Sequence, residues 1–413
     1  MRFNVSPSNL SDALSLAQIV RTHKNALPAM QHMRLVVSGD YVLITATDND
    51  VTISVEVASC AIAEEGECLF DPAVLAAVLD QRAAKAASSV TLEQNSENAP
   101  MLIVGKQGTP LVKSYFDPLE YPALPKMIHE ATLAATIYRF ATCDLLYGLK
   151  IVSPFVSTDD GRPNLTGALL DVTRDPNTAM LVSTDGHSLG KAVLPCVVEG
   201  ESRGVIIPLY YLAAVLPKVV HGPQTTLRFY KSEVSYFTPR VYVAGVCTRG
   251  AIFASVRHID ASFPDFTRVI PALNPKKTIL VERKDLTTSA AEMTKISAAF
   301  DKSVKSMLRV QQIIDNGAAE VRLTGGPASL AASRDQSEIT NGIAVSAIPV
   351  DPNAPNSMAT IGINPQYLGR IAKSNAESLC ELCCVDALSP MLWIPVVNTP
   401  KYEVLMITMP MRL

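Results

Sequence analysis

The chain has 413 residues, of which 48% are hydrophobic and 18% are charged, and its formal net charge at pH 7 is −3. This length predicts two to four domains. The slightly acidic balance argues against a generally basic surface that coats nucleic acid, but it is compatible with a local basic surface. The sequence contains no run of about eighteen apolar residues, so we expect no transmembrane helix and no membrane partner.

The first residues and the cysteines indicate a compartment. The opening MRFNVSPSNLSD lacks a basic region followed by an apolar run, so we expect no signal peptide. The eight cysteines show no framework spacing, and a chain of this length does not need disulfides. We therefore expect a cytoplasmic location.

One pattern occurs three times along the chain. A short strand leads into a helix at RFNVSPSNLSDAL, at TIYRFATCDLLYGL and at TILVERKDLTTSAA. The three strands are centred near Phe3, Tyr138 and Leu280. Because these centres lie roughly 140 residues apart, each repeat has the size of a whole domain.

Two further landmarks recur in the same order. Each copy has a tight polar turn that begins at a threonine, at Thr47, Thr184 and Thr324, and continues with the Asp, Asn and Gly residues that such turns select. Each copy then has a second helix with a proline near its start, where the missing N–H costs nothing. These helices are predicted in CLFDPAVLAAVLDQ, VIIPLYYLAAVLPK and IGINPQYLGRIAKS, with Pro72, Pro208 and Pro365.

Strand signals dominate between these landmarks. Runs of strands interrupted by two helices predict an α+β fold with antiparallel sheets. Proline-rich segments, YPALPK and FPDFTRVIPALNPKK, close the first two copies. We therefore predict three copies of a two-helix, antiparallel-sheet domain, at residues 1–126, 127–273 and 274–413.

The predicted second helices carry cations in all three copies. These are Arg82 and Lys85 in the first copy, Lys218 in the second, and Arg370 and Lys373 in the third. One interpretation is that each is a solvated helix face, which is the usual origin of such charges. The other is that a symmetric assembly brings them onto one surface. That surface would bind phosphates without sequence preference, because few neighbouring residues are suited to reading base edges.

Two other patterns suggest chemistry. Cys380, Cys383 and Cys384 have a C-x-x-C spacing, but a structural zinc needs four ligands and no second pair lies at a suitable spacing. We interpret these cysteines as small apolar residues of a strand.

A hydrolase would use Asp185, His187 and Asp265, with Ser183 or Ser188 as the nucleophile. Such a site needs the nucleophile, the base and the orienting group to converge. Asp185 and His187 lie in one tight turn, where Asp typically bonds to the backbone. We therefore expect no catalytic residue, no metal and no cofactor.

Three segments carry a resemblance to a known family: TDGHSLGKAVLP at 184–195, FPDFTRVIP at 263–271 and MPMRL at 409–413. Together with the repeat, they make the chain similar to the bacterial β sliding clamp, the processivity subunit of DNA polymerase III. The resemblance implies a cytoplasmic, nucleoid-associated homodimer whose six clamp domains form a ring around double-stranded DNA. DNA polymerase, clamp loader and repair proteins would bind it through short peptides. An alternative with the same fold is a phage, plasmid or accessory clamp that captures such peptides as a decoy.

The resemblance also implies a pocket for partner peptides beside the C-terminus. Carried over residue by residue, its members are Leu165, Thr184, Gly186, His187, Ser188, Leu189, Pro264, Arg268, Val269, Asn364, Tyr367, Leu388, Pro390, Ile407, Met409, Pro410, Met411, Arg412 and Leu413. Methionines suit a groove that accepts several peptides, because their side chains are flexible and polarizable. Ser188 stands where the family usually has Arg, so peptides tuned to an Arg-containing clamp should bind this chain more weakly.

The DNA-facing residues follow from the resemblance and from the helix charges together. Lys24 corresponds to a basic family position, and Arg162 lies near another. The full predicted set is Lys24, Arg82, Lys85, Arg162, Lys218, Arg370 and Lys373. The dimer interface should join the first domain of one subunit to the third domain of the other, with the strand around Leu111 and the helix at 287–300 as candidates.

Overall fold

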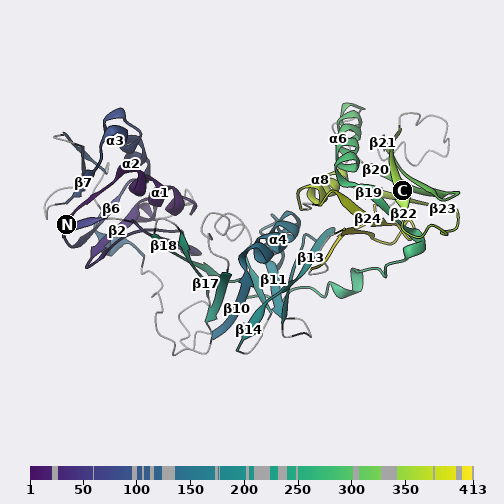
Figure 1. Ribbon diagram of the computed structural model, residues 1–413, viewed down its shortest axis with the longest axis horizontal. Coiled ribbons are helices and arrows are strands. Elements are labelled where there is room, and N and C mark those ends of the chain that lie inside the picture. Colours follow the sequence, from purple (N-terminus) through teal and green to yellow (C-terminus); the bar gives the residue numbers. More distant parts are fainter. Residues whose placement is uncertain are drawn as a thin grey trace. The chain divides into compact units, whose positions relative to one another are not determined.

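The computed structural model describes residues 1–20, 27–58, 60–94, 100–104, 107–111, 116–122, 135–172, 175, 177–200, 204–208, 224–230, 240–247, 250–300, 307–326, 342–374, 377–396 and 402–411 (Figure 1). Of the predicted site residues, Lys24, Lys218, Arg412 and Leu413 lie outside these ranges. Most of the second helix predicted for the middle copy also lies outside them.

The chain separates into two compact units, and each gathers segments that are distant in sequence. Unit 1 comprises Met1–Leu146, Cys196–Ser202 and Tyr210–His258. Unit 2 comprises Tyr147–Pro195, Arg203–Leu209 and Ile259–Leu413. The division runs through the predicted middle copy, so the three-domain boundaries stay a prediction.

Unit 1 contains the elements of the first copy and part of the second. Its helices are α1 (Pro7–Ala17), α2 (Pro72–Leu79) and α3 (Arg82–Ala86), with the 3₁₀ helices η1 (Pro28–Gln31) and η2 (Pro118–Glu120). Its strands are β1 (Arg2–Val5), β2 (Met33–Ser38), β3 (Tyr41–Thr47), β4 (Val51–Glu56), β5 (Ala61–Glu64), β6 (Gly66–Phe70), β7 (Val90–Glu93), β8 (Met101–Val104), β9 (Gln107–Pro110), β10 (Ala135–Ala141), β14 (Val197–Glu199), β16 (Gln224–Tyr230), β17 (Arg240–Cys247) and β18 (Gly250–Arg257). Within the described residues they form sheets in the orders β5-β1-β7-β8-β9 and β14-β10-β16-β17-β18-β4-β3-β2-β6.

Unit 2 contains the rest of the second copy and the third. Its helices are α6 (Arg283–Phe300) and α8 (Pro365–Ser374), the end of α4 (Thr142–Val152), and the 3₁₀ helices η3 (Ser153–Phe155), η4 (Pro163–Leu165), η5 (Thr267–Val269) and η6 (Pro275–Lys277). Its strands are β11 (Ala168–Val172), β12 (Thr178–Thr184), β13 (Ser188–Pro195), β15 (Val205–Ile207), β19 (Thr278–Glu282), β20 (Met307–Asp315), β21 (Ala318–Gly326), β22 (Gly342–Pro349), β23 (Ser357–Ile363), β24 (Leu379–Cys383), β25 (Met391–Pro395) and β26 (Glu403–Thr408). In the described part they form one sheet, in the order β15-β11-β12-β13-β26-β25-β24-β19-β22-β21-β20-β23.

The predicted strand-then-helix pattern is confirmed in all three copies, as β1-α1, β10-α4 and β19-α6. The strands pair antiparallel in each sheet, which confirms the α+β prediction. Local chemistry explains the helix starts. The Ser6 hydroxyl accepts a hydrogen bond from the Asn9 N–H at 3.2 Å, and Pro7 occupies the first turn of α1. The Asp71 carboxylate caps α2 in the same way, by accepting from the Ala73 N–H at 2.8 Å.

Two of the three predicted threonine turns are confirmed, and one is wrong. The strand β3 ends at Thr47 and β12 ends at Thr184, as expected. In the third copy, β21 continues past Thr324 through Gly325 and Gly326, which pair with β20. These two glycines extend the pairing of β21 with β20, because strand pairing satisfies the hydrogen bonds of their N–H and C=O groups as well as a turn would.

The predicted location of Arg82 and Lys85 on the second helix is also wrong. The helix α2 ends at Leu79, and both cations lie on the separate short helix α3. The backbone of Gln81 is extended between the two helices. Arg, Ala and Lys all favour helix, so residue propensity gave no sign of this break.

An apolar layer in unit 2 lies beside the predicted peptide pocket. Val182, Leu189, Cys383, Leu392 and Ile407 are buried together on the large sheet. The connector formed by residues 263–270 covers them with the partly buried side chains of Phe263, Phe266, Val269 and Ile270. Each buried aliphatic side chain contributes about 1.5–3 kcal/mol through the hydrophobic effect, so this contact fixes the connector on the sheet. Among the described residues, no helix is long and apolar enough to cross a membrane.

Candidate functional site

The site begins with the tight turn between β12 and β13. The Thr184 hydroxyl donates to the carbonyl of Ser188 at 2.7 Å and accepts from the Gly186 N–H at 3.0 Å. Gly186 has a φ of +88°, which L-residues with side chains rarely adopt. The threonine and the glycine therefore close the turn and set the direction in which its other side chains point.

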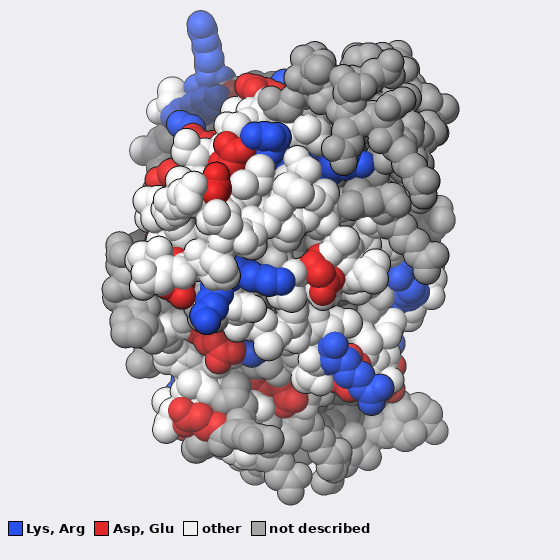
Figure 2. Space-filling view, turned by 90° about the vertical axis from the view of Figure 1, so that its right-hand side faces the viewer, with Lys and Arg blue, Asp and Glu red and all other residues white. Residues whose placement is uncertain are grey.

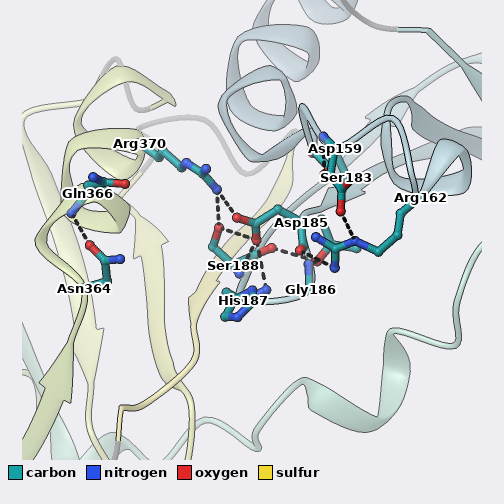
Figure 3. Close-up of polar contacts among 12 residues, drawn as sticks. Asp159, Arg162, Ser183, Asp185, Gly186, His187, Ser188, Asn364, Gln366 and Arg370 are labelled. Atoms are coloured by element: carbon teal, nitrogen blue, oxygen red, sulfur yellow. Dashed lines mark hydrogen bonds and ion pairs between the residues drawn. The ribbon is translucent and has the colours of Figure 1, made fainter. Parts of the chain in front are cut away.

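Asp185 is the centre of this turn (Figure 3). Its Oδ1 accepts from the N–H groups of His187 and Ser188, at 2.9 and 2.7 Å, and from the Ser188 hydroxyl at 3.0 Å. Its Oδ2 forms an ion pair with Nη1 of Arg370, which reaches across from α8. Burial alone would raise the pKa of Asp185, but the two backbone N–H groups and the Arg370 guanidinium outweigh burial and hold that pKa below its usual value. The carboxylate therefore stays ionised and ties the turn to α8.

Arg370 and Tyr367 lie on the same face of α8, because residues three apart on a helix are neighbours. The guanidinium carbon of Arg370 is 5.4 Å from the centre of the Tyr367 ring, within the range of a cation–π contact. The His187 ring centre lies 6.1 Å from that of Tyr367. Burial, and then the Asp185 charge, raise the pKa of Tyr367 above its usual value. These three side chains form a partly exposed polar and aromatic surface.

A second arginine approaches the turn from the η4 segment. Arg162 Nε donates to Asp159 at 2.8 Å, and Arg162 Nη1 donates to the carbonyl of Asp185 at 3.3 Å (Figure 3). Leu165, which follows in η4, is buried with 6% of its surface exposed. Arg162, predicted to face DNA, thus lies beside residues predicted for the peptide pocket.

The C-terminal strand completes the arrangement. β26 pairs with β13, with Leu189 opposite Ile407, and the Met409 N–H then donates to the His187 carbonyl at 2.8 Å. The Met411 N–H donates to the carbonyl of Gly362 at 2.7 Å, just before α8. The last described residues therefore run from the Asp185 turn to Gly362, near the end of β23.

The remaining predicted pocket residues lie at different depths. Leu189 and Ile407 are buried under the connector, to which Pro264, Arg268 and Val269 belong. Arg268 is exposed and paired with Asp265 at 2.8 Å. Leu388 is 80% exposed in the turn before β25, and Pro390 ends that turn.

A cavity of about 570 Å³ lies in unit 2, and none of the residues predicted for the peptide pocket lines it. Its walls come from residues 270–273 and from β24, β25 and β26. Ile270, Leu392 and Leu405 line this cavity and also belong to the apolar layer that contains Leu189, Val269 and Ile407. The cavity and the predicted pocket thus share one apolar layer.

The predicted DNA-facing cations are distributed over both units. Arg82 and Lys85 are exposed on α3, where Lys85 pairs with Asp80 at 2.5 Å, and Lys373 is exposed near the end of α8. Arg370 has a partner inside the Asp185 turn, which sequence reasoning missed. The face shown in Figure 2 carries Lys and Arg interspersed with Asp and Glu, so both signs are present in its described part.

The hydrolase arrangement does not form among the described residues. The Ser188 hydroxyl contacts Asp185 and Arg370, and the Ser183 hydroxyl donates to the Val152 carbonyl. No hydrogen bond joins the His187 ring to either serine in this part of the chain. Asp265 bonds to Thr267 and Arg268. A nucleophile, base and orienting group therefore do not converge here.

The cysteines near 380 lie in or next to β24, as predicted. Cys380 and Cys383 are strand residues and Cys384 follows them; all three are buried. Burial raises the pKa of Cys380 to about 12. A thiol with so high a pKa remains protonated near neutral pH.

Comparisons with known proteins give consistent results. A family model for the DNA polymerase III beta subunit, N-terminal domain, matches residues 1–125. The beta sliding clamp of Rickettsia felis is 22% identical over 392 residues, which cover 95% of each chain. The beta sliding clamp of Bacillus subtilis is 27% identical over 295 residues, which cover 69% of this chain and 71% of that one.

Solved structures extend the likeness along the whole chain. The DNA polymerase sliding clamp of Bacillus subtilis has a TM-score of 0.78 at 19% identity, covering 100% of this chain and 99% of that one. The sliding clamp of Bartonella birtlesii bound to griselimycin has a TM-score of 0.77 at 20% identity, with full coverage of both chains. The fold is therefore that of the sliding clamps of bacterial DNA polymerases. The family model matches the first 125 residues, and the clamp sequences match at 22% and 27% identity, so the sequence comparisons agree with the fold.

Proposed function

We propose that two copies of this chain close into a ring around double-stranded DNA and that the ring tethers DNA polymerase to its template. The observation that carries this proposal is the full-length clamp fold together with the element order that recurs along the chain. A closed ring holds DNA by topology, so its contacts to phosphates need be neither strong nor specific. In this proposal the chain is a scaffold without catalytic activity or cofactor, and it works on DNA in the cytoplasm.

The DNA-facing surface of the ring is proposed to carry the predicted cations, namely Lys24, Arg82, Lys85, Arg162, Lys218, Arg370 and Lys373. The exposure of Arg82, Lys85 and Lys373 supports this assignment, because exposed cations are available to phosphates. Arg162 and Arg370 also hold contacts within unit 2, so we expect them to contribute less to DNA binding than the exposed helix residues do.

Partner proteins are proposed to bind with short peptides beside the C-terminus, at the predicted pocket residues. Support comes from the way unit 2 brings together the Asp185 turn, the start of α8 and the end of β26, three segments distant in sequence. The apolar layer beneath the connector would receive apolar peptide side chains. Griselimycin bound to the Bartonella clamp provides a ready probe for such a site.

The ring proposal is tested by cutting the DNA. The chain is loaded onto nicked circular DNA by the clamp loader of the same organism with ATP, and the DNA-bound fraction is isolated. The circle is then linearised with a restriction enzyme. We expect the chain to stay on the circle and to leave after the cut, because a topological link is lost at a free end.

A linear DNA whose two ends are blocked by bound protein is the control, and it should retain the chain. Retention on open linear DNA would mean that the chain binds by contact and would contradict the ring. A chain that binds clamp-binding peptides but is never loaded would favour the decoy alternative.

A further inference from the structure

We propose that Arg370 selects partner peptides that carry a carboxylate, by donating hydrogen bonds to it from the free edge of its guanidinium. The inference rests on the proposed peptide-binding function and names the chemistry of the preferred partner: a short apolar segment with one acidic side chain. Arg370 lies in unit 2 on α8, and its side chain is 30% exposed.

Only one terminal nitrogen of Arg370 is occupied by the turn. Nη1 pairs with Oδ2 of Asp185 and donates to the Ser188 hydroxyl at 3.1 Å (Figure 3). Within the described residues, Nε and Nη2 have no hydrogen-bond acceptor. A guanidinium carries five N–H donors in a planar fork, and a carboxylate matches two of them at once. The geometry thus leaves a donor edge for a ligand.

The guanidinium is also held in one orientation. Asp185 and Ser188 fix its Nη1 end, and the Tyr367 ring lies 5.4 Å from its central carbon. Asp185 itself is 11% exposed and accepts from four donors, so its carboxylate is satisfied inside the turn. An arginine fixed in this way loses little side-chain freedom when it binds a ligand, which favours selectivity.

Two other described arginines, Arg162 near the turn and Arg268 in the connector, already have acidic partners. Arg162 is bonded to Asp159, and Arg268 is bonded to Asp265. Of these three described arginines, Arg370 therefore offers a peptide carboxylate the donors that no acidic side chain occupies. Because the side chain is partly exposed and partly neutralised by Asp185, we expect a moderate preference, of about fivefold in Kd.

The aromatic surroundings define the rest of the partner. The Tyr367 ring presents its face to the guanidinium, the His187 ring lies 6.1 Å from the Tyr367 ring, and Met409 and Met411 follow from β26. Flexible methionines and ring faces suit apolar side chains of varied shape. An acidic residue beside an apolar one therefore matches this surface better than an amide or a cation does.

The test uses pairs of matched peptides and the full-length chain. A labelled peptide from the host polymerase is synthesised with Glu, and then with Gln, at each position in turn, and Kd is measured by fluorescence anisotropy. Displacement by griselimycin checks that the peptides share one site. For wild type, we expect the Glu peptide to bind about fivefold more tightly than its Gln partner at one position or more.

The variant Arg370→Met keeps an apolar stem but has no N–H donors. It should lose the preference for Glu and bind the Gln peptide as wild type does, within about twofold. Lys284→Met, at an exposed lysine of α6 in the same unit, is the control and should keep the preference. Circular dichroism of both variants checks that they fold.

The results distinguish a wrong assignment of Arg370 from the absence of a peptide site. If wild type binds Glu and Gln peptides equally at every position, or if Arg370→Met keeps the preference, the assignment of Arg370 is wrong and the peptide site stands. If wild type binds none of the peptides, the proposed peptide function fails and this inference fails with it.

Discussion

The turn between β3 and β4 and the turn between β12 and β13 have the same backbone design. Thr47 and Thr184 each donate to the carbonyl four residues ahead, at 3.0 and 2.7 Å. Asp48 Oδ1 accepts from the Val51 N–H at 2.7 Å, and Asp185 Oδ1 accepts from the corresponding N–H, that of Ser188, at the same distance. In both turns the residue after the Asp has a positive φ. The repeat therefore extends to individual hydrogen bonds.

The side chains around these two turns differ. In the first turn, Asp50 forms an exposed ion pair with Arg257 at 3.3 Å, and Val51 is buried. In the second turn, His187 and Ser188 take the positions of Asp50 and Val51. The Ser188 hydroxyl forms hydrogen bonds with Asp185 and Arg370. Val51 has no hydroxyl, so the first turn has no equivalent of these bonds. The same turn backbone thus has only a structural role between β3 and β4, whereas it forms part of a polar site between β12 and β13.

The largest expected effect is on stability, and it differs between Asp185 and Asp48. Asp185→Ala should lower the free energy of unfolding by about 2–3 kcal/mol, because it removes four hydrogen bonds and leaves the partner Arg370 uncompensated. Asp48→Ala, in the half-buried first turn, should cost only about 1 kcal/mol. Urea unfolding of both variants beside wild type measures the difference. Equal losses would mean that Asp185 has no role beyond the turn it shares with Asp48.

Acid should weaken the second turn through the same carboxylate. The pKa of Asp185 is lower in the folded chain than in the unfolded one, so its stabilising contribution is present above the unfolded pKa of about 3.9 and is lost as pH falls through the folded pKa. The stability difference between wild type and Asp185→Asn should stay constant from about pH 7 to about pH 5 and shrink below about pH 4. Unfolding measured across that range tests this; a difference that grows in acid would contradict it.

The smallest of these effects comes from the positive-φ position. Gly186→Ala should cost about 1–2 kcal/mol, because a Cβ strains the backbone at a φ of +88°. The new Cβ would also lie 3.3 Å from Nη1 of Arg162, a flexible atom that is able to move. Gly186→Asn should cost less, since Asn49 occupies this position in the first turn at a φ of +74°. If Gly186→Ala and Gly186→Asn lower the unfolding temperature equally, the positive φ does not constrain the residue at this position, and the comparison with Asn49 fails.

Local sequence signals were sufficient for much of the fold. Apolar strands followed by capped helices predicted β1-α1, β10-α4 and β19-α6, and Pro72 and Pro365 lie in the first turns of α2 and α8 as expected. Signals of this kind act over a few residues. The break between α2 and α3 escaped prediction because the residues that follow Gln81, in α3, favour helix.

The site was less predictable because its key contact is distant in sequence. The turn role of Asp185 followed from its neighbours, but Arg370 lies 185 residues further along. A cation on a helix face usually indicates solvent or a charged ligand, so nothing local distinguished Arg370 from Lys373. Only the folding of β13, β26 and α8 into one unit brings the guanidinium to Ser188.

Light scattering over a dilution series measures whether the chain forms a two-subunit ring in solution. The chain has a mass of 44.4 kDa. We expect a stable mass near twice this value that persists on dilution, because a clamp must stay closed to hold DNA. A mass of one chain at every concentration would contradict the ring and, with it, the topological tether.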